Sequence, residues 1–287
     1  MKKIFLLIFL SIYFSNSSYN GLLLPKNTFE LLTNNSNYSF YQDIILSTQK
    51  NDLASTSYLN YPNSISANYI SYDYYISNLS MKSSIQIIDY GNIEDSSSGY
   101  SFDSMDYIFT QRFSSRLYNK IFSSLEMNYL YSKIDNFNSS VFATKLDFFY
   151  NTDEVIIEIF IDNYGKVLNS YTRYIEDLPK LYGYSLLFKP KNLNVLLSLK
   201  QEYQNNVYDF VYDFNFNTEL IFKNNSIIFG YSSMGKNLYY GDFNDDFFTG
   251  TSIGFKTQYK KFQIILGYQN LGPLGNSSSF SLNHLIN

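Results

Sequence analysis

Residue types that support enzyme chemistry are scarce in this chain of 287 residues. It has no cysteine, which excludes disulfides, thiolate metal ligands and thiol nucleophiles. It has one histidine, His284, which excludes a histidine-based triad or a multi-histidine metal site within one chain. Only 16% of the residues are charged and the formal net charge is -4, so nucleic acid is not an expected partner. We predict no catalytic residues, no cofactor and no metal site.

Long apolar runs are missing after the first residues. Met1-Lys2-Lys3 is positively charged, and Ile4 to Phe14 is apolar, which is the pattern of a secretory signal peptide. We therefore predict a signal peptide over residues 1–18. An uncleaved anchor helix is the alternative, but the run is shorter than the roughly 20 apolar residues that a span requires. If the mature chain crosses a membrane, it does so with strands.

Aromatic residues are abundant, with 30 tyrosines and 26 phenylalanines, and they favour strands. From Ile65 onward, segments of about ten residues alternate between apolar and polar side chains, as in strands with two different faces. In the segment Val211 to Phe222, one face carries Tyr212, Phe214, Phe216, Leu220 and Phe222, and the other carries Asp213, Asn215, Asn217 and Glu219.

Alternation alone also suits a water-soluble sandwich, and the lengths of the connections distinguish the two folds. Short turns are expected at Asp73, 115–118, 151–153, 190–192, 223–225 and 259–261. Between them lie the longer connections 89–104, 134–139, 163–180, 204–210, 233–247 and 271–278. Strict alternation of short and long connections predicts an all-β, transmembrane, antiparallel up-and-down β-barrel with short periplasmic turns and longer extracellular loops in the bacterial outer membrane.

The number of strands predicts where the barrel begins. About thirteen strands follow Ile65, and bacterial single-chain barrels usually have an even number, so an earlier strand is expected. Tyr38 to Thr48 alternates suitably and is the predicted first strand, bringing the total to about 14. We therefore divide the chain into the signal peptide, an N-terminal lead-in or lumenal hatch over residues 19–37, and a barrel over residues 38–287.

The lumenal face is expected to be polar and to carry both charges. Lys145, Asp147, Glu126, Asp213, Glu219 and Lys256 are predicted to point inward. Charges of both signs argue against a strongly selective ion pore. Gly250, Gly254 and Gly267 are predicted to be single glycines within strands, where they permit bends or close packing. Asp242, Asp245 and Asp246 crowd one long loop and could offer oxygen ligands to Ca²⁺, but their spacing matches no calcium loop, so no metal site is predicted there.

Several segments resemble a known family. Four segments are similar, in order and spacing, to elements of the PorV and PorQ proteins of type IX secretion, which belong to the FadL-like class of barrels. These segments are Tyr58-Leu59-Asn60-Tyr61-Pro62, Ile88-Asp89-Tyr90-Gly91-Asn92, Ile161-Asp162-Asn163-Tyr164-Gly165 and Leu178-Pro179. The resemblance covers most of the mature chain and is stronger to PorQ. It implies a non-enzymatic barrel that anchors surface partners handling exported cargo.

Two other roles stay open at this point. One is a FadL-like transporter of hydrophobic small molecules, with the lead-in as a hatch, and the other is a structural porin. Outer-membrane lipid is an expected partner. Other type IX components or surface proteins would bind the extracellular loops at roughly 163–180 and 233–247, because these are the longest loops and lie on a rigid scaffold. The alternation of residues does not decide whether the lumen is open, plugged or lined for a ligand.

Overall fold

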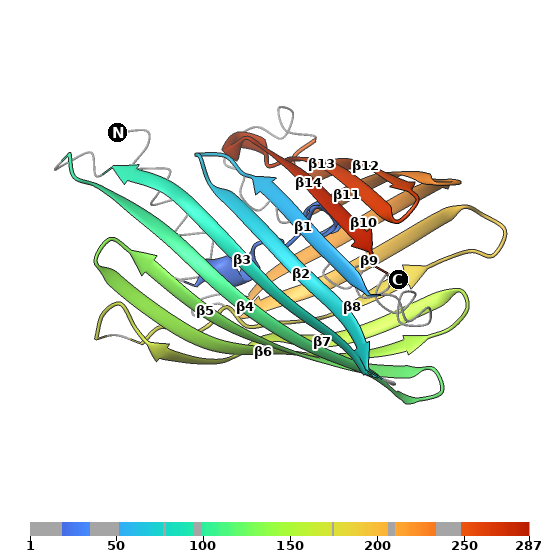
Figure 1. The fold of residues 1–287 in the computed structure, drawn as a ribbon, viewed down its shortest axis with the longest axis horizontal. Coiled ribbons are helices and arrows are strands. Elements are labelled where there is room, and N and C mark those ends of the chain that lie inside the picture. Colours follow the sequence, from blue (N-terminus) through green and yellow to red (C-terminus); the bar gives the residue numbers. More distant parts are fainter. Residues whose placement is uncertain are drawn as a thin grey trace.

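The computed structural model describes residues 19–34, 52–76, 79–94, 99–173, 175–205, 210–233 and 248–286. Across these residues, fourteen antiparallel strands form a closed barrel in which each strand pairs with its sequence neighbours and β1 pairs with β14 (Figure 1). The predicted up-and-down barrel is confirmed. In the same part of the chain, no helix is long and apolar enough to cross a membrane.

The strands are β1 (Leu53–Asn60), β2 (Ser66–Ile76), β3 (Leu79–Glu94), β4 (Ser101–Tyr118), β5 (Ile121–Ile134), β6 (Phe137–Asn151), β7 (Val155–Asn169), β8 (Leu181–Phe188), β9 (Val195–Asn205), β10 (Phe210–Phe222), β11 (Asn225–Ser232), β12 (Thr251–Tyr259), β13 (Phe262–Asn270) and β14 (Asn276–Leu285). The short helices are η1 (Asn20–Leu23), α2 (Thr28–Thr33) and η2 (Gly272–Leu274).

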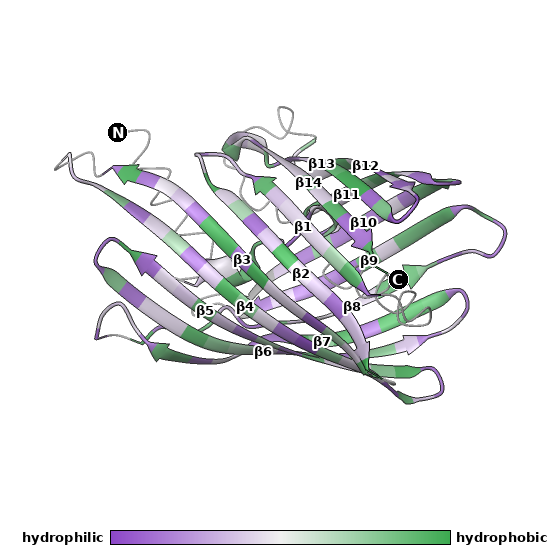
Figure 2. Cartoon of the chain, in the orientation of Figure 1, coloured by the Kyte–Doolittle hydropathy of each residue, from purple (hydrophilic) through white to green (hydrophobic). Residues whose placement is uncertain are grey.

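Most of the buried polar side chains of the strands point into the barrel. On β10, Asp213, Asn215, Asn217 and Glu219 are buried, whereas Phe216 is 44% exposed on the outer surface. Green and purple residues alternate along the strands in Figure 2. A soluble sandwich would bury the aromatic face instead. The exposed apolar face therefore faces lipid, and the fold is that of an outer-membrane β-barrel.

Aromatic side chains border both ends of this apolar outer surface. Tyr58, Tyr212 and Tyr268 are exposed near one end of their strands, and Tyr150, Phe222 and Tyr259 near the other. Tyrosine suits the boundary between lipid and water because its ring is apolar and its hydroxyl is polar. His284 belongs to the second group, with its ring stacked on Phe262 at a centroid distance of 4.5 Å.

The connections divide into two sets. The first set lies at one end of the barrel, which we call the short-turn end, and comprises 77–78, 119–120, 152–154, 189–194, 223–224 and 260–261. The second set lies at the other end, which we call the long-connection end, and comprises 61–65, 95–100, 135–136, 170–180, 206–209, 233–250 and 271–275. The expected strict alternation of short and long connections fails in two places. The predicted long loop 134–139 is the two-residue turn Asp135–Asn136, and the connection 189–194 at the short-turn end is longer than 61–65, 206–209 or 271–275 at the other end. Asp135 takes a φ of 52°, which reverses the chain within two residues.

The first strand differs from the prediction. Tyr38 to Thr48 lies outside the described residues, and β1 (Leu53–Asn60) pairs with both β14 and β2, so the wall closes without that segment. The expected total of 14 strands is confirmed, but the first of them is β1. Its small residues, Ala54 to Ser57, show no clear alternation between apolar and polar side chains. Residues 1–18, the predicted signal peptide, also lie outside the described part.

The wall is taller on one side. Strands β3 to β7 have 14 to 18 residues each, whereas β8 has 8. In β7, Val155 to Asp162 pairs with β8, but the residues beyond Asp162 pair only with β6 in the described structure. The predicted loop 163–180 is therefore strand up to Asn169.

Candidate functional site in the barrel lumen

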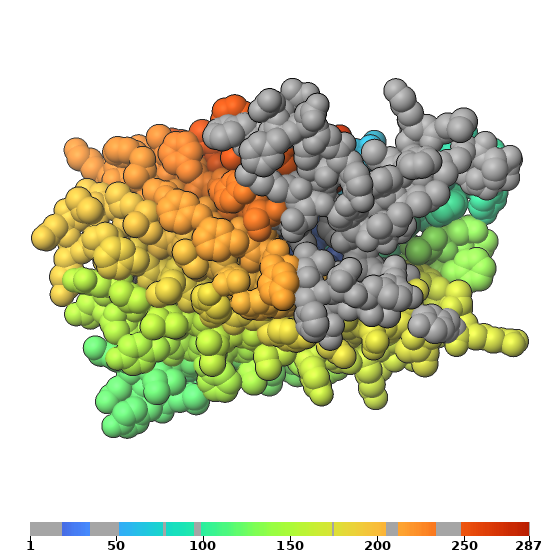
Figure 3. Space-filling model, turned by 180° about the vertical axis from the view of Figure 1, so that it is seen from behind, coloured from blue at the N-terminus to red at the C-terminus, as the bar shows by residue number. Residues whose placement is uncertain are grey.

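The N-terminal segment, residues 19–34, lies inside the barrel. Tyr19 and Leu31 are each 1% exposed, although neither belongs to the wall. In the space-filling view from behind, only a small blue area of this segment is visible (Figure 3). The described part of the predicted lead-in 19–37, residues 19–34, is thus a lumenal segment that fills part of the passage.

Glycines in the wall allow α2 to approach it closely. A Cβ atom on Gly230 would overlap the carbonyl oxygen of Leu32, and one on Gly254 would overlap the Leu32 side chain. A Cβ on Gly267 would lie 2.8 Å from Thr28 Cγ2. These three glycines, on β11, β12 and β13, form what we call the glycine platform. The expectation that Gly254 and Gly267 permit close packing is confirmed, whereas the placement of Gly250 within a strand is wrong: it lies in the turn before β12, with a φ of 83°.

Hydrogen bonds secure both ends of α2. Asn27 Oδ1 accepts from the backbone N–H of Glu30 at 3.0 Å, which caps the helix N-terminus. Ser281 Oγ accepts from the backbone N–H of Thr28 at 3.0 Å. At the C-terminus, Asn217 Nδ2 donates to the carbonyl of Thr33 at 2.8 Å. Wall side chains therefore satisfy backbone groups that a helix of six residues leaves unpaired.

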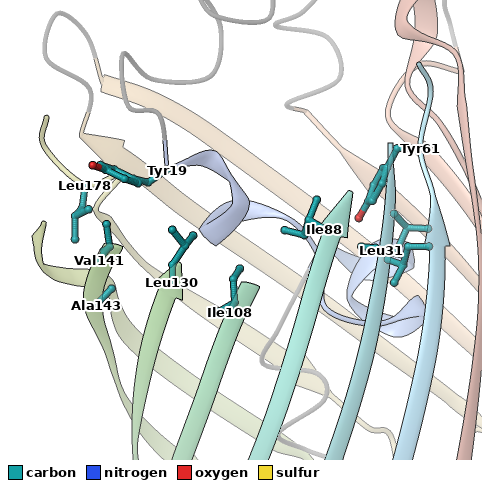
Figure 4. Close-up of a cluster of buried hydrophobic side chains, with 11 residues drawn as sticks. Tyr19, Leu31, Tyr61, Ile88, Ile108, Leu130, Val141, Ala143 and Leu178 are labelled. Atoms are coloured by element: carbon teal, nitrogen blue, oxygen red, sulfur yellow. The ribbon is translucent and has the colours of Figure 1, made fainter. Parts of the chain in front are cut away.

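The lumen is apolar near the long-connection end. Aliphatic side chains of β1 to β6 point inward there and pack against the N-terminal segment (Figure 4). We call this set the first apolar cluster: Tyr19, Leu31, Leu59, Tyr61, Ala67, Ile88, Ile108, Leu130, Val141, Ala143 and Leu178. The expectation of a polar lumenal face is wrong at this level, where the inward-facing side chains are apolar. Consecutive apolar residues, as in Tyr107-Ile108-Phe109 and Tyr129-Leu130-Tyr131, are the sequence signal for an apolar inner face.

A second apolar cluster lies toward the short-turn end. Phe29 and Leu32 of α2 pack there against wall residues that precede or follow the short turns. The wall members are Phe122, Phe149, Ile156, Leu187, Leu196, Ile228 and Ile265. Both ends of the described lumen thus offer apolar surface, and α2 lies against both clusters through different side chains.

Buried charges separate the two clusters. Arg112, Glu126 and Lys145 are direct cross-strand neighbours on β4, β5 and β6, so their charges alternate across the wall. Asp147 lies 3.5 Å from Lys145 and 3.8 Å from Arg112, and Lys200 lies 2.6 Å from Glu202. We call these residues, with Glu158, Glu219 and Lys256, the charged belt. The inward orientation predicted for Lys145, Asp147, Glu126, Asp213, Glu219 and Lys256 is confirmed for these buried or half-buried side chains.

Lys26 joins the N-terminal segment to the charged belt. Its ammonium nitrogen lies 2.5 Å from Glu126 Oε1. Burial by itself would lower the pKa of Lys26, but the carboxylates of Glu126 and Glu30 outweigh it and raise that pKa above the ordinary value of 10.5. Lys26 is therefore a cation at neutral pH. Its charge compensates the negative charge of the largely buried Glu126 carboxylate.

The start of the segment contacts the loop between β7 and β8. The ring of Tyr19 stacks on Tyr171 at a centroid distance of 6.4 Å, and its hydroxyl lies 2.9 Å from Ser139 Oγ. The Tyr171 hydroxyl in turn donates to Ser132 Oγ. Asn163 Nδ2 donates to the carbonyl of Pro179 at 3.1 Å, which fastens the same loop to β7. The segment is thus held at the rim, at the belt and at the glycine platform.

The other candidate sites are the possible calcium ligands and the loops predicted to bind partners. Within the described ranges, no group of three or more His, Cys, Asp or Glu side chains is arranged to hold a metal ion. Asp242, Asp245 and Asp246, the possible calcium ligands, lie outside those ranges, as does most of the predicted binding loop 233–247. Partner binding by the loops therefore stays a prediction.

Comparison with known proteins shows the fold. No family model and no curated protein matches the chain. The CymD monoaromatic hydrocarbon channel matches with a TM-score of 0.61 and 8% identity over 92% of this chain and 98% of CymD. A ΔS2S3 mutant of the TodX monoaromatic hydrocarbon channel matches with a TM-score of 0.53 and 8% identity over 81% and 87%. The P. putida toluene transporter TodX gives 0.50 and 9% over 83% and 89%.

These matches place the chain in the class of outer-membrane β-barrels. Sequence identities this low show similarity of fold and not of function. The matched structures are described as channels or transporters, and they give no support to the predicted role in type IX secretion.

Proposed function

We propose that this barrel admits small hydrophobic molecules through the outer membrane. The observation that carries the proposal is the first apolar cluster, since its wall members present inward-facing aliphatic side chains at a level where a water-filled pore would have polar ones. A lumenal pocket lined by apolar side chains with a few polar groups is the usual form of a site for a small apolar ligand.

The N-terminal segment suits a gated passage better than an open porin. Leu31 occupies the first cluster and Phe29 the second, so the segment covers apolar surface that water would otherwise contact. A ligand entering the first cluster would compete with these side chains and move part of the segment. The fold match to channels described as carrying monoaromatic hydrocarbons, CymD and TodX, is in keeping with this substrate class.

Ligand binding and transport test the proposal directly. The barrel in lipid nanodiscs should release an apolar naphthalene fluorophore when toluene is added, beyond the release from empty nanodiscs. Leu130→Gln, in the first cluster, should weaken displacement about tenfold, because a buried amide would lack a partner. Leu196→Gln makes the same change in the second cluster and should have a much smaller effect. Cells that produce the barrel should also take up radiolabelled toluene faster than cells without it.

Two results would refute this function. One is toluene displacement no greater than from empty nanodiscs, and the other is uptake that is the same with and without the barrel. Heat-modified migration on a gel should first establish that each variant is a folded barrel.

The secretion role implied by the PorV and PorQ resemblance is the competing proposal. It would place a surface partner at the long-connection end, where Ile175 in the connection 170–180 and Leu168 near the end of β7 are 69% and 51% exposed. Mild detergent extraction followed by affinity capture would recover secretion components in that case. Recovery of the barrel alone, together with toluene uptake, would favour the channel.

A further inference from the structure

Tyr61 brings a polar group into the first apolar cluster. It follows β1 in the connection 61–65, and its side chain is 9% exposed. Figure 4 shows its ring directed inward, with the hydroxyl toward Leu31 and Ile88. The hydroxyl oxygen is buried and has no hydrogen-bond partner in the described structure. A buried hydroxyl without a partner is costly, so its retention in an apolar cluster calls for an explanation.

The surroundings of this hydroxyl favour one kind of ligand group. Burial, and then the negative charge of Glu30, raise the pKa of Tyr61, so its phenol is neutral and can donate or accept a hydrogen bond. Both carboxylate oxygens of Glu30 are already in use, since Oε2 accepts from the Lys26 backbone N–H at 2.8 Å and Oε1 from Asn27 Nδ2 at 3.3 Å. A second anion beside Tyr61 would meet the charge of Glu30, whereas a neutral hydroxyl would not.

A second polar atom lies on the N-terminal segment. Asn20 Oδ1 is buried and has no hydrogen-bond partner in the described residues. The next residue, Gly21, lies against Asp106, whose Oδ2 accepts from the Tyr90 hydroxyl at 2.8 Å. Both Tyr90 and the neighbouring Leu22 pack against the first apolar cluster. Unused hydrogen-bonding capacity therefore comes from the connection 61–65, through Tyr61, and from the N-terminal segment, through Asn20.

We propose that Tyr61 is a head-group site within the lumen, which binds apolar molecules carrying one neutral hydroxyl, such as phenols, in preference to plain hydrocarbons or carboxylates. This inference rests on the proposed function and narrows its substrate class. The apolar body of the ligand contacts the aliphatic members of the cluster, and its hydroxyl exchanges a hydrogen bond with the Tyr61 hydroxyl. An unsubstituted hydrocarbon leaves that hydroxyl unpaired.

Three ligands of nearly equal shape test this site. Toluene, 4-methylphenol and 4-methylbenzoate share the ring and the methyl group and differ only at the position opposite the methyl group. At pH 7, toluene is apolar, 4-methylphenol carries a neutral hydroxyl and 4-methylbenzoate is an anion. Displacement of the naphthalene fluorophore from the barrel in nanodiscs, corrected with empty nanodiscs, ranks them. We expect 4-methylphenol to bind roughly three- to tenfold more tightly than toluene, as one net hydrogen bond provides. We expect 4-methylbenzoate to bind most weakly.

Two matched variants locate the effect. Tyr61→Phe removes only the hydroxyl and should abolish the preference for 4-methylphenol while leaving toluene unchanged. Tyr58→Phe removes a hydroxyl from the outer surface three residues earlier, where Tyr58 is 47% exposed, and should behave as the unaltered chain.

The results of these experiments distinguish a failure of the head-group site from a failure of the proposed channel function. Equal binding of toluene and 4-methylphenol to the unaltered barrel would overturn the head-group site and leave the hydrophobic channel standing. Retention of the preference in Tyr61→Phe would overturn the role of Tyr61. Failure of all three ligands to displace the fluorophore would overturn the channel, and the head-group site with it.

Discussion

The Lys26 ammonium lies 2.5 Å from Glu126 Oε1, so one ion pair connects a segment that crosses the lumen to the charged belt of the wall. Both side chains are largely buried. Around this contact the segment also has its rim contacts through Tyr19 and its platform contacts through α2.

Loss of this ion pair should release the segment from the belt. Lys26→Met leaves the Glu126 carboxylate without its partner from the segment and should cost about 2 kcal/mol of docking free energy, a thirtyfold change in the docked fraction. Because the chain has no cysteine, Leu22→Cys provides a unique site for a maleimide, and its labelling rate should rise about thirtyfold in the Lys26→Met background. Lys191→Met is the control, since its pair with Glu154 is exposed. Equal rates in both backgrounds would contradict the prediction.

Raising the pH should loosen the same attachment. The pKa of Lys26 is raised in the folded chain, so the stabilisation by its charge is complete below the ordinary pKa of 10.5 and is lost as the pH rises through the raised value. Labelling of Leu22→Cys, corrected for the reactivity of the thiolate with a free cysteine peptide, should be constant from neutral pH to about pH 10 and increase above it. In Lys26→Met this increase should be smaller. An equal increase in both would assign it to Tyr19 or Tyr61, whose pKa values are also raised by burial.

Substitutions in the glycine platform should have graded effects. Gly230→Ala brings a methyl group against the backbone carbonyl of Leu32, which can move only with α2, and should cost about 2 kcal/mol of docking. Gly254→Ala meets the end of the Leu32 side chain, which can rotate away, and should cost less. The labelling assay compares the two variants. A larger effect of Gly254→Ala would contradict the close approach of the backbone at Gly230.

The outer apolar face should tolerate charge only at its edges. Phe216→Arg places a charge in the middle of β10 on the lipid side and should cost about 2–4 kcal/mol of folding free energy, whereas Phe222→Arg, at the short-turn end, should cost about 1 kcal/mol or less. Reversible folding into lipid vesicles at several urea concentrations measures both. Equal costs would show that the apolar band does not run between the two aromatic borders.

The orientation of the barrel can be tested on intact cells. Ile175→Cys lies in a long connection, predicted to be extracellular, and should react with a maleimide that cannot cross the membrane. Asn224→Cys lies in the turn between β10 and β11 and should react only after the outer membrane is made permeable. The reverse pattern would show that the short turns face outward.

Local sequence determined the wall of this protein. The alternation around Phe216 identifies β10, and its two opposite faces predict a barrel because side-chain direction in a strand is set by each residue's place in the pleat. The tight turns near Lys223 and Lys260 are also predicted from local sequence, because each turn lies between two runs of alternating apolar and polar residues. Gly254 and Gly267 signalled close packing, although nothing nearby in the sequence indicates what packs on them.

Tertiary structure decided what the lumen contains. Leu32 meets Gly254 across more than two hundred residues of chain, and Lys26 meets Glu126 across one hundred, so no local pattern reports either contact. The choice of Leu53–Asn60 as the first strand depended on pairing with β14, which a weak alternation in Ala54 to Ser57 could not reveal. Alternation reports which face of a strand turns inward, but closure of the barrel decides which inward side chains become neighbours and where Tyr61 places its hydroxyl.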